Sequence, residues 1–546
     1  MLLIEASKIK QYFGDRLLLD MDHLRIYSED RIGIVGRNGV GKTTFINILS
    51  NRIQPSDGWV RLYGEYSYIS QLEEPVHKII SDEIASKFGV EALWQDHMSG
   101  GEKTRFKLAK AIEDHKVILF ADEPTSNVDM EGIELMEKIF NGYKGAFVVI
   151  SHDRSFLDRV CNKILEIENG RIKIYSGNYT DYQHQKEKEK ERAVFEYEEY
   201  ISEKKRLEEV RKETKERIKG LRKTPKRMGN SEARLHKMGP QKAKANLDRS
   251  VKSVEKRIEH LEVKEKPKEE AVMKLDVLDS NKLHSKIVVA GKNIEKSFGS
   301  NRIFHNAEFN IYNGTKVALI GPNGCGKSTL IKMILAHEDS IKIAQGAKIG
   351  YFSQNMDILN VKQSILENVM ESSIYPENFA RLLLSRLLFK REDVYKKVEV
   401  LSGGERVKVS FAKIVLQDIN FLILDEPTNY MDIDSLEVIE ETLKNYDRTL
   451  LFVSHDRRFV EAIADNIMTI ENKKIKVFHG TYQEYLSRKS KATTSMNEER
   501  NQQILLLKNR LSEVIGRLSL PSKGDDIEAL DKEYHTILAE LQKFKA

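Results

Sequence analysis

Two nearly identical glycine-rich loops stand out in the sequence, because each one leads into a lysine and a hydroxyl residue. The first occupies residues 36–44 and the second occupies residues 321–329. Each loop follows an apolar run typical of a buried strand and precedes helical sequence. In that context the backbone N–H groups of the loop surround phosphate groups, and its lysine reaches the β- and γ-phosphates. The predicted nucleotide contacts are Gly36, Asn38, Gly39, Gly41, Lys42, Thr43, Thr44, Gly321, Asn323, Gly324, Gly326, Lys327, Ser328 and Thr329.

Adjacent carboxylates end two further apolar runs, as Asp122-Glu123 and as Asp425-Glu426. A run of this kind is typical of a strand that is buried on both faces. We predict that Glu123 and Glu426 polarise the attacking water of a phosphate-transfer reaction. The alternative, a helix cap built from Asp-Glu-Pro, fits the spacing to the glycine loops less well. The predicted Mg²⁺ ligands are the aspartates, through water, and the loop hydroxyls: Thr43, Asp122, Ser328 and Asp425.

A histidine follows another apolar run in each half of the chain. His152 and His455 both stand in the sequence Ser-His-Asp-Arg. A single histidine in such a place would more often be structural, but its repetition favours contact with the γ-phosphate. The tetrapeptide Ser-Gly-Gly-Glu also occurs twice, as Ser99, Gly100, Gly101 and Glu102 and as Ser402, Gly403, Gly404 and Glu405.

The motifs recur in one order, so the chain contains an internal repeat. The glycine-loop lysines are 285 residues apart, whereas the Ser-Gly-Gly-Glu serines and the two histidines are 303 apart. Gln71 and Gln354, which follow the glycine loops, are 283 residues apart. One sizeable insertion therefore separates the copies after the glutamine, and the first copy has the smaller insert. Two unrelated nucleotide folds would not maintain a constant offset across several motifs.

The chain between the two copies is dense in charge, and its apolar residues are periodic. A 4-3-4-3 spacing, typical of a helical seam, relates Leu247, Val251, Val254, Ile258 and Leu261. A similar but less regular face precedes it at Leu207, Val210, Ile218 and Leu221. We predict an antiparallel helical hairpin, in which about forty residues of helix reach about 60 Å. Its tip is expected to be irregular, because helix is interrupted at Gly220, Pro225, Gly229, Gly239 and Pro240.

The predicted fold class is α/β, with two tandem nucleotide-binding domains joined by this hairpin. The domains are expected at residues 1–183 and 266–490, and the hairpin linker at residues 184–265. A helical C-terminal extension is expected at residues 491–546, as a pair of helices over residues 497–518 and 527–544.

The expected tip of the hairpin is strongly basic. Residues 219–249 contain ten cations and two anions, a net charge of +8, whereas the whole chain has +5. Such charge on a long arm favours a polyanion, and the interleaved apolar side chains could stack on bases. A solvated charged helix is the alternative, and it fits residues 186–209 better. The candidate RNA-binding residues are Arg222, Lys223, Lys226, Arg227, Met228, Arg234, His236, Lys237, Lys242 and Lys244.

Length and composition narrow the class of protein. A chain of 546 residues is too long for a single hydrophobic core. No apolar stretch has the length of a membrane span, so no membrane segment is expected. The two cysteines suggest neither a disulfide framework nor a zinc module, and a cytoplasmic location is expected.

Taken together, the glycine loops, the strand-end carboxylates and the repeated Ser-Gly-Gly-Glu resemble those of ATP-binding-cassette ATPases. The resemblance implies P-loop domains in which Ser-Gly-Gly-Glu of one cassette closes over ATP held by the other. It therefore implies two composite sites within one chain, both hydrolytic, because neither copy lacks its glutamate, lysine or histidine. It also implies that Gln71 and Gln354 bind Mg²⁺ and that Phe13 and Phe298 stack on adenine. Plain strand packing is the alternative role of the two phenylalanines.

Two cassettes joined by a long charged hairpin resemble the ABC-F family of ribosome-associated ATPases. The resemblance includes the Gly-x-Tyr-x-x-Tyr pattern that closes each cassette, at residues 177–182 and 480–485. It implies a monomer whose hairpin enters the transfer-RNA exit site of the ribosome, beside ribosomal RNA and transfer RNA, when ATP closes the cassettes. The small first insert, the extended tip and the C-terminal extension resemble the antibiotic-resistance (Vga-type) branch. That branch protects the peptidyl-transferase centre from lincosamides, pleuromutilins and streptogramins A.

Several other functions remain open at the level of sequence. A general translation factor of the same family would share every motif. A transporter ATPase subunit would need a separate membrane partner and would have no use for a basic hairpin. DNA-maintenance ATPases place a coiled coil inside one nucleotide fold or carry several zinc-binding cysteines, so DNA is not expected as a partner. A scaffold that uses ATP only as a clamp is disfavoured by the intact glutamates.

Overall fold

The computed structural model describes residues 1–71, 73–75, 77–220, 230–264, 266, 283–353, 358–429 and 431–491, with short stretches between residues 506 and 539. For residues 230–242 it describes only the backbone. The chain divides into two compact units, and each contains one copy of the sequence repeat. The first unit comprises Met1–Thr125 and Leu135–Lys274, and the second comprises Ser126–Glu134 and Leu275–Ala546.

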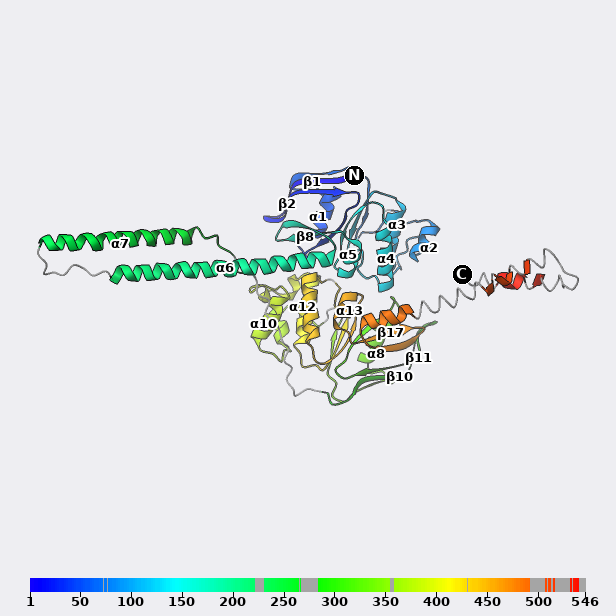
Figure 1. Cartoon of the computed structure of the whole chain (residues 1–546). Coiled ribbons are helices and arrows are strands. Elements are labelled where there is room, and N and C mark those ends of the chain that lie inside the picture. Colours follow the sequence, from blue (N-terminus) through cyan, green and yellow to red (C-terminus); the bar gives the residue numbers. More distant parts are fainter. Residues whose placement is uncertain are drawn as a thin grey trace. The chain divides into compact units, whose positions relative to one another are not determined.

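The first cassette is built on one mixed sheet (Figure 1). Its strands are β1 (Leu2–Phe13), β2 (Arg16–Tyr27), β3 (Arg31–Val35), β4 (Asp57–Leu62), β5 (Tyr66–Ile69), β6 (Ile118–Asp122), β7 (Ala146–Ile150), β8 (Lys163–Glu168) and β9 (Arg171–Ser176). Its helices are α1 (Lys42–Leu49), α2 (Asp82–Phe88), α3 (Gly100–Glu113), α4 (Met130–Gly142) and α5 (Arg154–Val160). The strand order is β4-β1-β2-β9-β8-β3-β7-β6-β5. The strands β8, β3, β7, β6 and β5 run parallel to one another, so the loops after them meet at one edge of the sheet.

The second cassette repeats this plan. Its strands are β10 (Ile287–Phe298), β11 (Asn301–Tyr312), β12 (Lys316–Ile320), β13 (Ile341–Ile343), β14 (Ile349–Phe352), β15 (Phe421–Asp425), β16 (Thr449–Val453), β17 (Asn466–Glu471) and β18 (Lys474–His479). They form sheets of order β11-β10-β13 and β14-β15-β16-β12-β17-β18. Its helices are α8 (Lys327–Leu335), α9 (Ile365–Met370), α10 (Glu377–Arg386), η2 (Asp393–Tyr395), η3 (Val398–Val400), α11 (Gly403–Val415), α12 (Ile433–Lys444) and α13 (Arg457–Ile463). Helix α10 lies in the longer insert of this copy.

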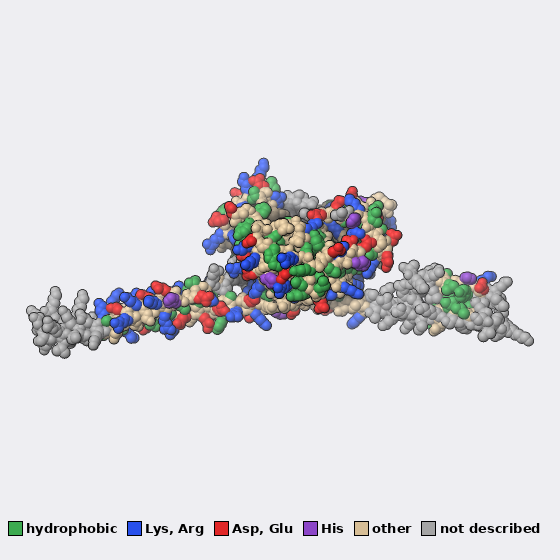
Figure 2. Space-filling view, turned by 90° about the horizontal axis from the view of Figure 1, so that it is seen from above, with side chains coloured by type: hydrophobic (Ala, Val, Ile, Leu, Met, Phe, Trp, Pro, Cys, Tyr) green, Lys and Arg blue, Asp and Glu red, His purple; other side chains and the backbone are tan. Residues whose placement is uncertain are grey.

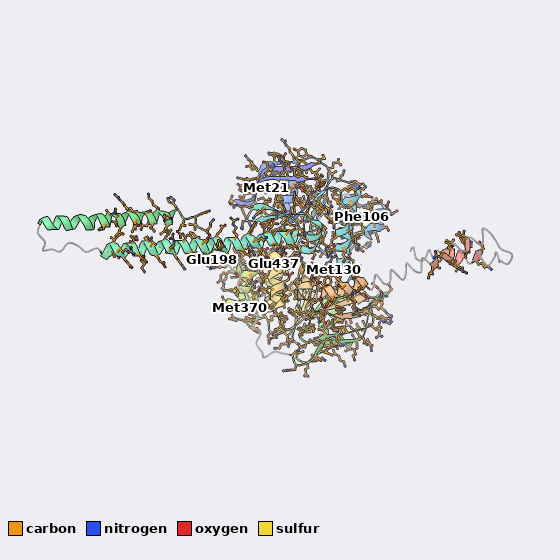
Figure 3. The ribbon with its side chains drawn as sticks, viewed as in Figure 1. Met21, Phe106, Met130, Glu198, Met370 and Glu437 are labelled. Atoms are coloured by element: carbon orange, nitrogen blue, oxygen red, sulfur yellow. The ribbon has the colours of Figure 1, made fainter. Side chains whose placement is uncertain are left out.

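The core of the first cassette explains why its glycine loop has a fixed place. Met21 of β2, labelled in Figure 3, packs in one buried cluster with Phe45 of α1 and Phe120 of β6. Full burial of such an apolar side chain stabilises the fold by about 1.5–3 kcal/mol. The cluster therefore holds α1 between the antiparallel and the parallel strands. The equivalent cluster of the second cassette joins Phe304, Leu330 and Phe421.

The hairpin consists of α6 (Tyr179–Gly220) and α7 (Asn230–Glu259), which lie side by side in Figure 1. Helix α6 has 42 residues, which correspond to about 60 Å. Leu207, Val251 and Val254 are buried between the two helices. Lys215 of α6 also pairs with Glu255 of α7 at 2.8 Å. The expected helical hairpin and its seam are therefore confirmed. Helix α6 begins at Tyr179, before the expected boundary at residue 184.

Two details of the hairpin differ from expectation. Gly239 and Pro240 do not interrupt helix, because α7 continues through both. Proline has a φ angle compatible with helix and removes one hydrogen bond, so a long helix can accommodate it at a cost of about 3 kcal/mol. Val210 is 40% exposed rather than buried in the seam.

Helix α6 is joined to the first cassette by a buried carboxylate. Glu166 of β8 accepts hydrogen bonds from Tyr182 of α6 at 2.8 Å and from Tyr175 of β9 at 3.2 Å. It also forms an ion pair with Lys186 of α6. Glu166 is the register partner of Val35, which precedes the glycine loop. The base of the hairpin and the glycine loop are thus attached to the same pair of strands.

Part of the C-terminal extension lies within the described residues. Helical turns occur at residues 506–507, 509–511 and 514–515, and again at residues 531–532 and 534–539. Val514 and Ile537 are buried against each other, with Leu507, Leu511 and Tyr534 around them. Two helical segments therefore pack together, as expected. Within the described part of the chain, no helix combines the length and the hydropathy needed to cross a bilayer.

Candidate nucleotide sites

Both glycine loops have backbone that only glycine accommodates well. Gly41 has φ 104°, and a Cβ atom there would lie 2.9 Å from Leu18 of β2. Gly326 has φ 111°, and its Cβ would lie 2.5 Å from Ile303 of β11. These glycines are the N-caps of α1 and α8, with no side chain bonded to the first turn. The first-turn N–H groups of each helix therefore face the loop, which is the arrangement that binds phosphate.

The lysine of each loop folds back over the loop. Lys42 Nζ donates to Gly36 O at 2.7 Å and to Arg37 O at 3.2 Å. Lys327 Nζ makes the same contacts with Gly321 O at 2.8 Å and Pro322 O at 3.1 Å. Both lysines are buried. An ammonium group held at the centre of a ring of backbone amides is suited to the charge of the β- and γ-phosphates.

The strand-end glutamates have an unusual backbone conformation in both copies. Glu123 has φ 51° and Glu426 has φ 52°, in the left-handed region that costs a residue with a side chain about 1–2 kcal/mol. The Glu123 N–H donates to Ile150 O at 2.9 Å, at the end of β7, and the Glu426 N–H donates to Val453 O at 3.0 Å, at the end of β16. The strain is held by the neighbouring strand, so each carboxylate has a fixed position beside the histidine that follows that strand.

Each histidine lies against the glutamate of its own copy. His152 Nε2 is 3.1 Å from Glu123 Oε1, and His455 Nε2 is 3.3 Å from Glu426 Oε1. Burial raises the pKa of Glu426 to about 7, while the Lys327 ammonium opposes that shift. Burial also lowers the pKa of His455 to about 4, so this imidazole is neutral near pH 7. The neutral His455 and the Glu426 carboxyl group therefore lie beside each other without forming an ion pair.

The predicted metal ligands meet in pairs. Thr43 is hydrogen-bonded to Asp122, and Ser328 is hydrogen-bonded to Asp425. Burial raises the pKa of both aspartates, and the hydroxyl contact and the nearby lysine oppose that shift. A hydroxyl and a carboxylate side by side at the mouth of a phosphate loop are the oxygen donors that Mg²⁺ prefers, so these residues fit the ion.

The Ser-Gly-Gly-Glu motifs are helix starts. Ser99 caps α3 and Ser402 caps α11, and each forms a capping box with the glutamate three residues later. The Glu102 carboxylate accepts from the Ser99 N–H at 2.8 Å, and the Glu405 carboxylate accepts from the Ser402 N–H at 2.9 Å. Each glutamate thus orients its own helix start, a role that the sequence interpretation missed although Ser-x-x-Glu before a helix signals it. The exposed N-terminus that results is suited to an anion.

A segment from the first repeat, Ser126–Glu134, groups with the second unit. The Asn323 N–H of the second glycine loop donates to Asp129 Oδ2 at 3.0 Å, and its side-chain amide donates to Asn127 O at 3.1 Å. The buried Arg457 donates to the carbonyl of Met130, which Figure 3 labels, at 3.0 Å. The second glycine loop is thus bordered by the first cassette's own sequence. Asp129 and Arg457 were not predicted as site residues, although both lie in motifs that the repeat marks.

The remaining predicted residues divide into three groups. Phe13 and Phe298 are 81% and 59% exposed at the tips of their strand pairs, so plain strand packing is wrong for them. Gln71 is described and exposed, whereas Gln354 lies outside the described residues. Of the candidate tip residues, Lys244 is exposed on α7. Arg234, His236, Lys237 and Lys242 have only their backbone described, in α7, and the others lie outside the described residues: Arg222, Lys223, Lys226, Arg227 and Met228.

Comparison with known proteins agrees with this geometry. Residues 19–126 and 304–429 match the family described as ABC transporter. The erythromycin resistance ATP-binding protein MsrA of Staphylococcus epidermidis is 33% identical over 85% of this chain and 96% of its own length. The chain belongs to the ABC-F family. As an ABC-F protein it binds ATP and is an ATPase.

Other relatives extend the likeness of this ABC-F chain to its whole length. The ribosome protection protein VmlR of Bacillus subtilis is 28% identical over 99% of this chain and 98% of its own length. Among solved structures, an archaeal ribosome recycling factor, aABCE1, in complex with the stalk protein aP1, aligns with a TM-score of 0.58. That alignment covers 89% of this chain and 92% of the other at 18% identity, so it shows the fold alone.

Proposed function

We propose that this ABC-F ATPase binds the ribosome in its ATP-bound state and protects the peptidyl-transferase centre from antibiotics. The observation that carries the proposal is the end-to-end similarity to VmlR, whose name states ribosome protection. The name of MsrA, which states erythromycin resistance, supports the same direction. The expected drug classes are lincosamides, pleuromutilins and streptogramins A. The chain would act in the cytoplasm, as a monomer.

The nucleotide chemistry follows from the paired residues of each cassette. Lys42 and Lys327, with the N–H groups of their loops, would bind the β- and γ-phosphates. Mg²⁺ would neutralise phosphate charge, held by Thr43 with Asp122 and by Ser328 with Asp425, and also by Gln71 and Gln354. Glu123 and Glu426 would accept a proton from the attacking water. The histidine beside each glutamate would orient it and contact the γ-phosphate.

We propose that the two sites are composite. In one site the second cassette's helix start, Ser402 to Glu405, would cover ATP bound at Lys42, Glu123 and His152. In the other, Ser99 to Glu102 would cover ATP bound at Lys327, Glu426 and His455. The exposed, capped N-termini of α3 and α11 support this role, because such helix ends attract phosphate. The contact of Asp129 with Asn323 also supports it, because sequence from the first cassette already borders the second loop.

The hairpin would carry the consequence of ATP binding to the ribosome. Its base is bonded through Glu166 to the strand next to the glycine loop, so the arm would move as a part of the first cassette. Its length of about 60 Å would allow the basic tip to reach from the exit site toward ribosomal RNA and transfer RNA. There the tip would displace the drug or reshape its pocket, and hydrolysis would release the protein.

Cell-free translation tests the proposal. Susceptible bacterial ribosomes are mixed with lincomycin, tiamulin or virginiamycin M, with erythromycin as a fourth drug, and the purified protein is added with ATP. Protein synthesis should recover at drug concentrations that otherwise stop it, with at least one of the three expected classes. The matched control is the Lys42→Ala/Lys327→Ala variant, which should not restore synthesis. No recovery with any of the four drugs, while the protein still hydrolyses ATP, would contradict protection.

A further inference from the structure

The outer face of the antiparallel strands in the first cassette carries aromatic rings and arginines. Strand alternation sends Ala6, Leu24, Ile26, Val60 and Leu62 into the core. The residues between them face outward. We call five of these the aromatic–arginine face: Arg25 and Tyr27 of β2, Trp59 and Arg61 of β4, and Tyr63, which follows β4.

The rings of this face are open to solvent. Trp59 is 41% exposed, Tyr27 is 44% exposed and Tyr63 is 47% exposed. Figure 2 looks down on the side where β1 and β2 lie, and there green and blue side chains lie next to one another. Burying three large rings in the core would stabilise the fold, so their exposure points to a partner.

The charged groups of the face are held in place. Glu5 of β1 lies between Arg25 and Arg61 in the strand register. Its carboxylate accepts from Arg25 Nε at 2.9 Å and from the Tyr63 hydroxyl at 3.4 Å, and the Arg25 hydrogen bond lowers the pKa of Glu5. The Arg61 guanidinium lies over the Trp59 ring, 4.7 Å from the ring centroid. Arg25 is thus paired with Glu5 while Arg61 stacks on Trp59, and the face has an excess positive charge beside a stacked ring.

The second cassette lacks most of this face, although its strands have the same register and Tyr312 stands at the position of Tyr27. In the strand register Glu5 lies opposite Arg25 and Arg61. The corresponding residue of the second cassette, Ala290, lies opposite Asn310 and Lys342. The Tyr63 N–H donates to Leu3 O. In the second cassette the equivalent bond runs from the Ala344 N–H to Val288 O, so Ala344 stands at the position of Tyr63. The position of Trp59, opposite Ser7, corresponds to Ser340, whose carbonyl accepts from Lys292. The fold therefore does not require Trp59, Tyr63 or the two arginines at these positions.

We propose that the aromatic–arginine face of the first cassette binds unpaired ribosomal RNA, with a base stacked on Trp59 and phosphates on Arg25 and Arg61. The inference rests on the proposed ribosome binding and adds a contact separate from the hairpin tip. Aromatic rings stack on any base, and arginine binds phosphate in a fork and also stacks. Apart from the half-buried Leu2, which is the register partner of Tyr27, the outward positions are polar, charged or aromatic: Glu5, Ser7, His23, Arg25, Tyr27, Trp59, Arg61 and Tyr63. Two arginines against one carboxylate leave the face positively charged, and this charge complements the phosphates of RNA, so RNA is favoured.

Crosslinking tests which macromolecule the face contacts. Trp59 is replaced by the photoreactive residue p-benzoylphenylalanine in the full chain that carries Glu123→Gln and Glu426→Gln. The protein is irradiated on ribosomes with ATP, and the adducts are digested with ribonuclease or with protease. We expect an adduct with ribosomal RNA. An adduct with a ribosomal protein alone, or no adduct although the chain pellets with ribosomes, would overturn the inference.

A variant tests whether the face contributes affinity. Trp59→Ser/Tyr63→Ala carries the residues that the second cassette has at the same positions, so the fold should tolerate it. One lost base stack should weaken ribosome binding by about tenfold, while ATP hydrolysis without ribosomes stays unchanged. Lys342→Ser, on the corresponding face of the second cassette, is the control and should not change binding. Unchanged affinity of the double variant would overturn the inference.

Intrinsic fluorescence separates this inference from the ribosome proposal. The chain has two tryptophans, and Trp94 is buried, so Trp94→Phe leaves the exposed Trp59 as the only tryptophan, whose emission is excited selectively at wavelengths that tyrosine does not absorb. A single-stranded RNA of twelve nucleotides should quench this emission at low salt, and less so as the salt concentration rises. Absence of quenching would contradict RNA stacking on Trp59 even if the chain binds ribosomes. If RNA quenches the emission but the chain does not bind ribosomes, RNA binding by the face is supported and the ribosome proposal is rejected.

Discussion

The carboxyl group of Glu426 is buried at the end of β15, and this environment controls when it can accept a proton. Its pKa of about 7 means that the carboxylate forms mainly above neutral pH. The Glu123→Gln variant leaves the second site as the hydrolytic one. Its kcat/KM for ATP should rise by about tenfold between pH 6 and pH 8 and then level off. The measurement is initial rates at low ATP concentration across that range, and a flat profile would contradict the assignment of Glu426 as base.

The same burial affects the stability of the nucleotide-free protein. The folded-state pKa of Glu426 is raised above the unfolded value, so the folded state binds this proton more tightly, and stability falls as pH rises from about 4.5 through 7. Glutamine does not ionise, so Glu426→Gln removes this fall in stability with rising pH. The variant should exceed the parent in free energy of unfolding by about 1–3 kcal/mol at pH 8 and by little at pH 5. Chemical denaturation at both pH values checks this, with Glu399→Gln, an exposed site, as the control that should show no such difference.

At the scale of elements, the joint between β8 and α6 is specific to the first cassette. The buried carboxylate of Glu166 has Thr469 at the corresponding place in the second. Glu166→Thr removes the carboxylate that Tyr182, Tyr175 and Lys186 share and should lower the free energy of unfolding by about 2–3 kcal/mol. Trypsin should then cut the start of α6 faster, while ATP turnover stays close to that of the parent.

The neighbouring pair of Glu189 and Lys173 provides the control for this joint. It is about half exposed, so Glu189→Gln should change stability by less than about 1 kcal/mol. Equal trypsin sensitivity of the Glu166 and Glu189 variants would show that the buried carboxylate does not fix the hairpin.

The elements also show what a sequence can and cannot reveal. The glycine loops, the strand-end carboxylates and the helical seam were predictable because each is a local pattern of residue type and spacing. The continuation of α7 through Pro240 was not predictable from local pattern. The cost of one proline is offset by the stability of the whole helix, and not by the residues next to it. The Glu166 joint and the aromatic–arginine face depend on which strands pair and in which register. That information belongs to the tertiary structure, as does the grouping of Ser126–Glu134 with the second unit.

On the scale of the whole molecule, the hairpin and the cassettes have separable roles. Replacing Arg222, Lys223, Lys226 and Arg227 with serine removes four charges from the expected tip. The salt dependence of ribosome binding should then weaken, with the slope of log affinity against log salt reduced by about 3. ATP hydrolysis without ribosomes should remain unchanged, because the cassettes are intact. The measurement is affinity at several potassium concentrations, and an unchanged slope would contradict phosphate contact at the tip.

Ribosome co-sedimentation of the Glu123→Gln/Glu426→Gln variant, with and without ATP, tests the central claim most directly. Loss of both general bases should prevent hydrolysis and hold the ATP-bound state on the ribosome. We expect the variant to pellet with ribosomes only when ATP is present, and less at high salt. If the variant binds ATP but stays in the supernatant, the chain is not a ribosomal ATPase of the kind proposed here.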